Sequence, residues 1–277
     1  YASIAEMSVG DLFAGMVIPA GVMVALFLLY IVGRCILQKD AGPGLDPAET
    51  QHSLGEKLRL AVTALLPAGL LVVAVLGSIF AGIAAPTEAA AVGALGALIL
   101  GFGYGTLSLP VLRDALVQTV KITSMVMLIV IGGTLFASIF IVHGGDTLVA
   151  DAIEGNGLGG MEIVAAFLFA VFVLGFVLDW ISVLIIVLPI AAPIVSGADI
   201  DPLWFGVMVC IVLQTSYLTP PMAPSIFYLR SIAPRDMTYA DMYRGVIPFV
   251  IAQLLTLALV ACWPATATWL PDVLFGF

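Results

Sequence analysis

A group of prolines interrupts an apolar stretch near the end of the chain. Residues 214–230 read QTSYLTPPMAPSIFYLR, with Pro220, Pro221 and Pro224 inside five consecutive positions. Each proline lacks a backbone donor and clashes with the carbonyl four residues earlier, so a helix must break near residues 219–221. In lipid, the freed carbonyls need protein, water or a bound ion as partners. Secondary transporters build ion and solute sites from broken helices of this kind, so the segment favours solute transport.

Oxygen atoms around this break have the chemistry of a sodium site. Thr219 offers a hydroxyl and a carbonyl directly before the prolines. The break is also expected to release the backbone carbonyls of Ser216, Tyr217 and Met222. Ligand sets made only of oxygen suit a hard cation such as Na⁺. The alternative is a structural kink, in which Thr219 bonds to its own helix as Ser and Thr often do in membrane spans.

Two acidic residues lie in or beside apolar segments and are further candidates. Asp179 lies within the apolar residues 161–195, where a buried charge is costly and suggests function. It can cap the helix that follows, over residues 181–193, and a cap that also supports the ion site is equally open. Glu88 follows Pro86 at a helix start, where the helix dipole favours an acid, so capping is its default role.

The polar residues one turn before the break are expected to line the same cavity. These polar residues, Pro220 and Pro221 of the break, and Glu88 form the predicted substrate pathway. Its members are Gln214, Thr215, Ser216, Pro220, Pro221 and Glu88.

Composition indicates that these residues belong to a membrane protein. Of the 277 residues, 62% are hydrophobic and 10% are charged, far outside the soluble average. The apolar runs are too long for barrel strands, which leaves a polytopic α-helical protein. The net charge of −9 argues against nucleic-acid binding, and the three cysteines show no metal-site spacing. Because Tyr1 is not a translational start and no signal-peptide pattern follows it, we expect the later part, or a processed piece, of a longer polypeptide.

The apolar runs and their breaks predict the order of the elements. Spans are expected over residues 12–37, 122–142 and 245–264, with a polar loop over 39–59 and a short amphipathic connector over 106–121. Residues 60–102 predict two helices joined by a tight turn at 82–86. Residues 143–160 predict a glycine-rich acidic loop. Residues 161–195 predict a second hairpin with Asp179 near its tip, and residues 203–229 contain the proline break.

The nine Lys and Arg residues orient this layout. Positive residues favour cytoplasmic loops, and here they gather in residues 34–59, 113–121 and 230–244. Residues 143–160 and 196–202 contain none and are expected outside. Residues 161–195 must then enter and return from outside. The tip of this outer hairpin is expected to face the broken centre of residues 203–229, where helix ends and carbonyls can hold a small cation.

Three segments resemble the large membrane subunit of a tripartite ATP-independent periplasmic (TRAP) transporter of the DctM type. They are VLGSIFAGIAAPTEAAAVGALGALILG, LGFVLDWISVLIIVLPIAAPI and LQTSYLTPPMAPSIFYLRSIAP. The resemblance covers essentially the whole chain, is nearest to the branch labelled mannitol/chloroaromatic transport, and corresponds to the C-terminal half or somewhat more of that subunit. It implies an elevator-type bundle with helical hairpins and a broken transmembrane helix, which acts as a Na⁺-driven importer in a bacterial inner membrane. The implied partners are a small four-helix membrane subunit and a periplasmic binding protein that delivers an organic acid.

The resemblance also implies site residues. A sodium site around the outer hairpin tip and the Thr-Pro-Pro motif corresponds here to Thr219, to the backbone carbonyl of Met222, and to the tip backbone around Asp179 and Trp180. Gly144 and Gly145 are a looser transfer into the same ion-binding set. A first sodium site is expected to use residues outside this chain.

Four parts are expected from the span order and the resemblance. Residues 1–59 hold the first span and a cytoplasmic loop, and residues 60–142 hold a helical hairpin and the following span. Residues 143–230 hold the outer hairpin and the broken helix as the transport domain, and residues 231–277 hold a cytoplasmic loop and the last span.

Other classes of protein stay open beside a binding-protein-dependent importer. An ion-coupled carrier that needs no binding protein would share the hairpins. A structural membrane subunit without its own site is disfavoured by the cost of the proline break. An intramembrane aspartyl protease would need a second membrane aspartate opposite Asp179, and the other predicted spans supply none. The sequence also contains no pattern for an organic cofactor.

Overall fold

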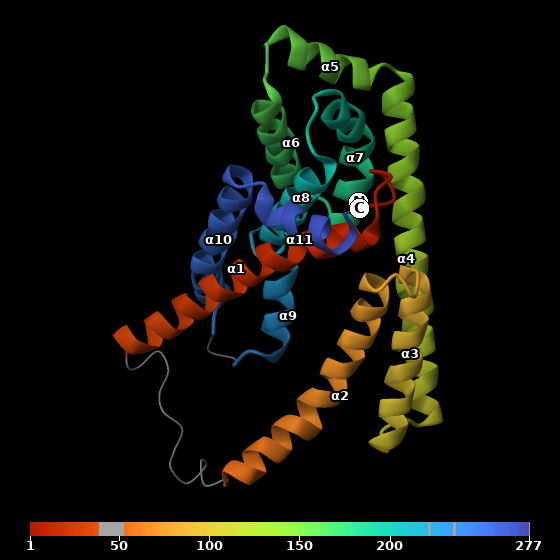
Figure 1. Ribbon diagram of the computed structural model, residues 1–277, viewed down its shortest axis with the longest axis vertical. Coiled ribbons are helices and arrows are strands. Elements are labelled where there is room, and N and C mark those ends of the chain that lie inside the picture. Colours follow the sequence, from red (N-terminus) through yellow and green to blue (C-terminus); the bar gives the residue numbers. More distant parts are fainter. Residues whose placement is uncertain (39–52, 221–222, 235–236, 277) are drawn as a thin grey trace. The chain divides into compact units, whose positions relative to one another are not determined.

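The computed structural model describes residues 1–38, 53–220, 223–234 and 237–276, and the regular elements in these ranges are all helices (Figure 1). In chain order they are α1 (Val9–Leu37), α2 (Leu54–Phe80), α3 (Pro86–Gly103), α4 (Leu109–Val142), α5 (Gly145–Gly155), α6 (Gly160–Leu174), α7 (Trp180–Gly197), α8 (Pro202–Ser216), α9 (Pro224–Ile232), α10 (Tyr239–Cys262) and α11 (Ala265–Phe275). Within the described residues, six of them are long and apolar enough to cross a membrane: α1, α2, α3, α4, α7 and α10. The prediction of an all-α polytopic membrane protein is confirmed.

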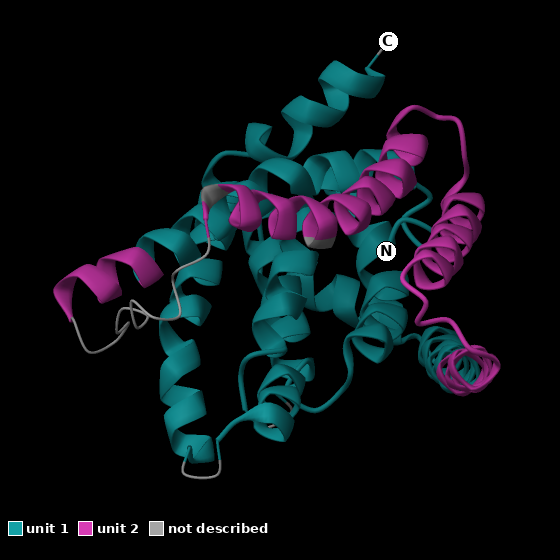
Figure 2. Ribbon diagram, turned by 90° about the horizontal axis from the view of Figure 1, so that it is seen from below, with its two compact units in different colours: residues 1–30, 123–277 teal, residues 31–122 magenta. Residues whose placement is uncertain are grey.

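The chain forms two compact units, which Figure 2 shows in different colours. Unit 1 comprises residues 1–30 and 123–277, and unit 2 comprises residues 31–122. In unit 2, α2 and α3 form the predicted hairpin, and Gly82 takes a left-handed φ of 66° in its turn. The two helices pack closely because Gly93 lies against Val75, and Tyr104 donates a 2.7 Å hydrogen bond to the Thr63 carbonyl. The four-part functional division stays a prediction.

The predicted connector over residues 106–121 is wrong, because it is continuous with the following span in the 34-residue helix α4. Pro110 lies in the first turn of α4, where no backbone donor is needed, so it starts the helix rather than breaking it. The predicted loop over residues 143–160 contains α5, whose Leu148, Val149, Ala152 and Ile153 repeat at helical spacing.

Three helix boundaries also differ from the prediction. Helix α2 begins at Leu54 inside the predicted polar loop 39–59, because Ser53 and Glu56 form a capping box. Residues 39–52 of that loop lie outside the described residues. Helix α10 begins at Tyr239, six residues before position 245, because Thr238 and Asp241 form a second capping box. Helix α11, after the last predicted span, was not predicted.

Helix α8 is the core of unit 1. It is apolar around its whole circumference. None of the ten residues from Trp204 to Leu213 is exposed. It packs against α6, α7, α10 and α11. Phe205 is 1% exposed and contacts Phe167 of α6 with a ring-centroid distance of 6.4 Å. Because α8 is held on several sides, its C-terminal end has a defined position.

A buried hydrogen bond joins α8 to the end of α10. The Trp204 Nε1–H donates to the Val260 carbonyl at 2.7 Å. Residue 264 is proline, so the donor that would normally reach this carbonyl from four residues later is missing. Trp204 therefore satisfies a carbonyl that the end of α10 leaves without a helical partner.

We predict that Trp204→Phe lowers the free energy of unfolding by about 1–3 kcal/mol, because the ring remains while the Val260 carbonyl loses its buried donor. Thermal unfolding in detergent measures this loss. Trp263→Phe is the matched control, since Trp263 is 63% exposed and its ring makes no hydrogen bond in the described part of the chain. Equal melting temperatures for the two variants would contradict this role of Trp204.

Candidate functional site at the outer hairpin tip

The outer hairpin turns through residues 175–179, between the end of α6 and the start of α7. The backbone donors of the tip bond back into α6: the Gly175 N–H reaches Val171, and the Leu178 N–H reaches Leu174 at 2.8 Å. Within the described residues, the carbonyls of residues 175–178 accept no hydrogen bond. The tip therefore presents backbone oxygens that are free to bind a cation or water.

Asp179 caps α7, as the sequence predicted. One carboxylate oxygen accepts hydrogen bonds from the backbone N–H of Ile181 at 3.1 Å and of Ser182 at 3.4 Å. The other accepts the Ser182 hydroxyl. A negative charge at the start of a helix is favoured by the helix dipole, and such a cap contributes about 1 kcal/mol. Asp179 thus fixes the tip to α7 and adds a negative charge beside its carbonyls.

The predicted break separates α8, which ends at Ser216, from α9, which begins at Pro224. The hydroxyl of Thr219 donates to the Thr215 carbonyl at 3.1 Å, which is the bond expected under the alternative of a structural kink. A hydroxyl that donates in this direction keeps its oxygen lone pairs for a cation. Pro221 and Met222 lie outside the described residues, so the structure says nothing of these two predicted positions.

The backbone where the chain re-enters a helix is strained. Ala223 has a left-handed φ of 29° directly before α9, a conformation that costs a non-glycine residue about 1–2 kcal/mol. Its N–H donates to the Thr219 carbonyl at 3.1 Å, and the Ser225 N–H donates to the Tyr217 carbonyl at 3.4 Å. These bonds close the break into a compact loop.

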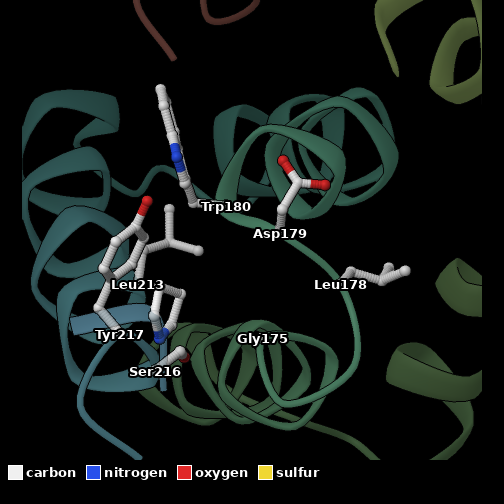
Figure 3. A pocket seen from close by; sticks show the side chains of 8 residues that line it. Gly175, Leu178, Asp179, Trp180, Leu213, Ser216 and Tyr217 are labelled. Atoms are coloured by element: carbon white, nitrogen blue, oxygen red, sulfur yellow. The ribbon is translucent and has the colours of Figure 1, made fainter. Parts of the chain in front are cut away.

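A small cavity lies between the hairpin tip and the break, with a volume of about 40 Å³ (Figure 3). Its walls come from both elements: Gly175, Leu178, Asp179 and Trp180 of the hairpin, and Leu213, Ser216, Tyr217 and Pro224 of α8 and α9. This space holds an ion or one to two water molecules. An organic molecule normally needs roughly 300 Å³ or more, so the cavity fits a small ion or water and not an organic ligand.

Equal helix lengths bring the two halves of this site together. Helices α6 and α8 have 15 residues each, so each rises about 22 Å, less than the hydrocarbon thickness of about 30 Å. Because α7 returns the chain to the side where α6 began, α6 and α8 start on the same side and run in the same direction. Their ends at Gly175 and Ser216 therefore lie beside each other.

Gly175 permits the close contact between these ends, and the sequence patterns did not predict it. A methyl group at this position would overlap the hydroxyl of Ser216 and lie 2.8 Å from its Cβ. Gly175 is buried, and its contact partner is about 40 residues away in the sequence. The LGF motif before Asp179 is the only local signal, and it reveals no partner.

The other predicted site residues divide into two groups. Trp180 and Ser216 line the cavity, and the Trp180 side chain is 46% exposed. Thr215 is buried and donates to the Ile211 carbonyl of its own helix, and Gln214 is exposed; neither lines the cavity. Pro220, also predicted for the pathway, is exposed, and neither Pro220 nor the half-buried Thr219 before it is part of the cavity wall.

Gly145 and Glu88 do not line this cavity. Gly145 is the buried first residue of α5, packed against the Phe140 ring, after Gly144 with a left-handed φ of 77°. Glu88 belongs to unit 2, where its carboxylate accepts the Ala85 N–H at 2.9 Å. Its default role as a cap is confirmed.

No group of three or more His, Cys, Asp or Glu side chains that would hold a metal gathers among the described residues. The polar atoms at the candidate site are backbone carbonyls, hydroxyls and the Asp179 carboxylate, beside a cavity whose wall is mostly apolar. Oxygen sets of this type suit a hard cation.

Comparison with known proteins identifies related sequences along the whole chain. Residues 1–266 match the family described as "Tripartite ATP-independent periplasmic transporter, DctM component". The sialic acid TRAP transporter large permease protein SiaM of Vibrio cholerae is 30% identical over 100% of this chain and 63% of its own length. The ectoine TRAP transporter large permease protein TeaC of Halomonas elongata is 29% identical over 99% of this chain and 62% of its own length. The C4-dicarboxylate TRAP transporter large permease protein DctM of Pseudomonas aeruginosa is 29% identical over 98% of this chain and 62% of its own length. The chain thus spans less than two thirds of the length of these relatives.

We predict that Gly175→Ala destabilises the protein by about 1–3 kcal/mol, because the added methyl group forces the hairpin tip away from α8. Thermal unfolding measures the loss. Gly197→Ala is the matched control at the other end of α7, where an added Cβ meets nothing within 4 Å. Adding Ser216→Gly to Gly175→Ala should restore part of the stability, since the overlapping atoms are removed. A double variant no more stable than Gly175→Ala would contradict the contact.

Proposed function

Because this chain belongs to the DctM component family of tripartite ATP-independent periplasmic transporters, we propose that it carries the solute-translocating core of a Na⁺-driven, binding-protein-dependent importer of organic acids. The chain is a polytopic protein of the bacterial inner membrane and a transport component, not an enzyme. The ion, the solute and the partners are part of the proposal.

The single observation that carries the proposal is the small cavity between the hairpin tip and the broken helix, beside tip carbonyls that accept no hydrogen bond within the described residues. In the proposed site, Na⁺ binds the Thr219 hydroxyl and tip carbonyls from residues 175–178, with the Met222 carbonyl as a further ligand. Asp179 adds a negative charge beside the ion, and the backbone at Trp180 forms part of the hairpin tip that surrounds it. The free carbonyls and the volume of about 40 Å³ support an ion without its full hydration shell.

Charge distribution supports coupling to a cation. Between Lys121 and Arg230 the sequence contains no Lys or Arg, so this part of the chain has no strong basic side chain for a carboxylate solute. A bound Na⁺ beside the hairpin tip would supply positive charge where the protein supplies none. The partial positive charge at the start of α7 would also attract a carboxylate, although the negative charge of Asp179 offsets it.

An elevator motion is consistent with the packing of unit 1. The hairpin tip and the end of α8 contact each other and share a core through α6 and α8. In the proposed mechanism these elements move together as the transport domain, and the ion and solute cross the membrane with them. The residues predicted for the substrate pathway, including Gln214, Thr215 and Glu88, stay predictions.

The partners in this proposal follow from the class of transporter. The names of the relatives describe large permease proteins, which supports a small membrane subunit as partner, and a periplasmic binding protein delivers the solute. Sialic acid, ectoine and C4-dicarboxylates, the solutes named for the three relatives above, all contain a carboxylate. The isethionate named for a further relative, from Oleidesulfovibrio alaskensis, contains a sulfonate instead. We therefore propose a carboxylate-containing solute for this chain.

We predict that proteoliposomes with the complete native polypeptide and its co-purified membrane partner take up labelled carboxylates only under an inward Na⁺ gradient. The panel contains sialic acid, ectoine and succinate, each assayed with and without periplasmic extract, and a K⁺ gradient is the control. Uptake that needs both Na⁺ and extract supports the proposal. Uptake that needs Na⁺ alone would instead indicate an ion-coupled carrier without a binding protein.

We also predict that Thr219→Ala raises the Na⁺ concentration for half-maximal uptake about tenfold, because a lost ligand contributes roughly 1.4 kcal/mol. The matched control is Thr256→Ala in α10. The Thr256 hydroxyl also donates to its own helix, to the Ala252 carbonyl at 2.9 Å. Neither threonine is part of the cavity wall, but Thr219 lies in the break just after the wall residues Ser216 and Tyr217, whereas Thr256 lies within α10. If the two variants have the same sodium dependence, Thr219 is not a ligand.

A further inference from the structure

Arg230 joins the end of α9 to the start of α10. Its Nη1 donates to the carbonyl of Met237 at 2.8 Å and to the carbonyl of Pro234 at 3.2 Å. Its guanidinium carbon lies 5.7 Å from the ring centroid of Tyr239, the first residue of α10. One side chain thus contacts the end of one helix, the connection between the helices and the beginning of the next helix.

A second contact holds the other end of α9. Ala223, Ile226 and Met242 form a buried apolar cluster, with exposures of 0%, 1% and 3%. Ile226 lies one turn into α9, and Met242 lies one turn into α10. Because α9 has only nine residues, the cluster near its start and Arg230 near its end together determine how it lies on α10.

The start of α9 is also part of the candidate ion site. Pro224 lines the cavity, and the Ala223 N–H donates to the Thr219 carbonyl at 3.1 Å. Ala223 has the left-handed φ of 29° described above, and such strained conformations persist only where the surrounding structure holds them. A change in the position of α9 would therefore alter the backbone on both sides of the break.

We propose that Arg230 is a positioning residue for the ion site: it fixes α9 on α10, and through Pro224 and Ala223 it holds the backbone at Thr219 in its ion-binding geometry. Arg230 does not contact the ion. The inference rests on the proposed function, because it concerns the affinity of that same site.

The contacts of Arg230 use more than its charge. A planar guanidinium can donate to two carbonyls while it lies against an aromatic ring, whereas the ammonium of lysine reproduces the charge but not this arrangement. Arg244 provides the matched control. It is an exposed arginine of the same helix pair, and its side chain makes no hydrogen bond in the described part of the chain.

The test measures Na⁺ binding by the thermal stabilisation of the complete native polypeptide, purified with its membrane partner in detergent. The melting temperature is recorded over a Na⁺ series at constant ionic strength, with K⁺ as replacement, because an ion that binds the folded state raises it. We expect Arg230→Gln to raise the Na⁺ concentration of half-maximal stabilisation at least fivefold. Arg230→Lys should raise it about two- to threefold, and Arg244→Gln should leave it unchanged.

The outcomes separate this inference from the proposed function. One outcome is that Na⁺ stabilises the unsubstituted parent protein and both Arg230 variants show the same Na⁺ concentration of half-maximal stabilisation. The positioning role is then wrong and the ion site stands. If both Arg230→Gln and Arg244→Gln shift it equally, the effect is one of charge, and the positioning role is also wrong. A parent that shows no Na⁺ response overturns the sodium site and the inference with it. If Arg230→Gln does not fold, Arg230→Lys alone decides, since it preserves the charge.

Discussion

The structure of the site depends on one constraint: a backbone carbonyl inside the membrane must have a positively polarised partner. A continuous helix satisfies each carbonyl with the N–H four residues later, and this chain interrupts that pattern at two places that lie together. At the hairpin tip the carbonyls of residues 175–178 lack partners in the described structure, and at the break the prolines remove donors. Two separate interruptions would each be costly in lipid. Placed against each other, they leave a small cavity beside the free oxygens, in which water or a cation can satisfy them.

The surrounding structure holds these interruptions at a fixed distance. Helix α8 is buried on several sides, so the end of α8 does not shift freely. Gly175 lets the tip approach Ser216, and Asp179 fixes the tip to the start of α7 with hydrogen bonds from two backbone N–H groups. The strained Ala223 then redirects the chain into α9. Each of these contacts contributes only about 1–3 kcal/mol, but they act on the same few residues.

The sequence predicts the parts of this arrangement that have local causes. Prolines in an apolar run predict the break, and Asp179 and Glu88 predict caps because capping involves residues two or three positions apart. The contact of Gly175 with Ser216 has no local cause, since it arises when two helices of equal length end beside each other. The same distinction explains the errors in the fold. The continuity of α4 depends on Pro110 lying in a first turn, and α5 is short and amphipathic within a segment whose glycines suggest a loop.

Cavity size and charge together limit how ion and solute can be coupled in the proposed function. A cavity of about 40 Å³ is too small for the solute, so in the proposed function the ion and the solute occupy different places. Asp179 carries a negative charge at this tip, and the sequence from residue 122 to residue 229 supplies no Lys or Arg to offset it. A carboxylate that approaches the tip without a bound cation is therefore repelled, and the repulsion is strong where water is excluded. In the proposed function, Na⁺ that binds first would remove this repulsion, which favours an order in which the ion precedes the solute.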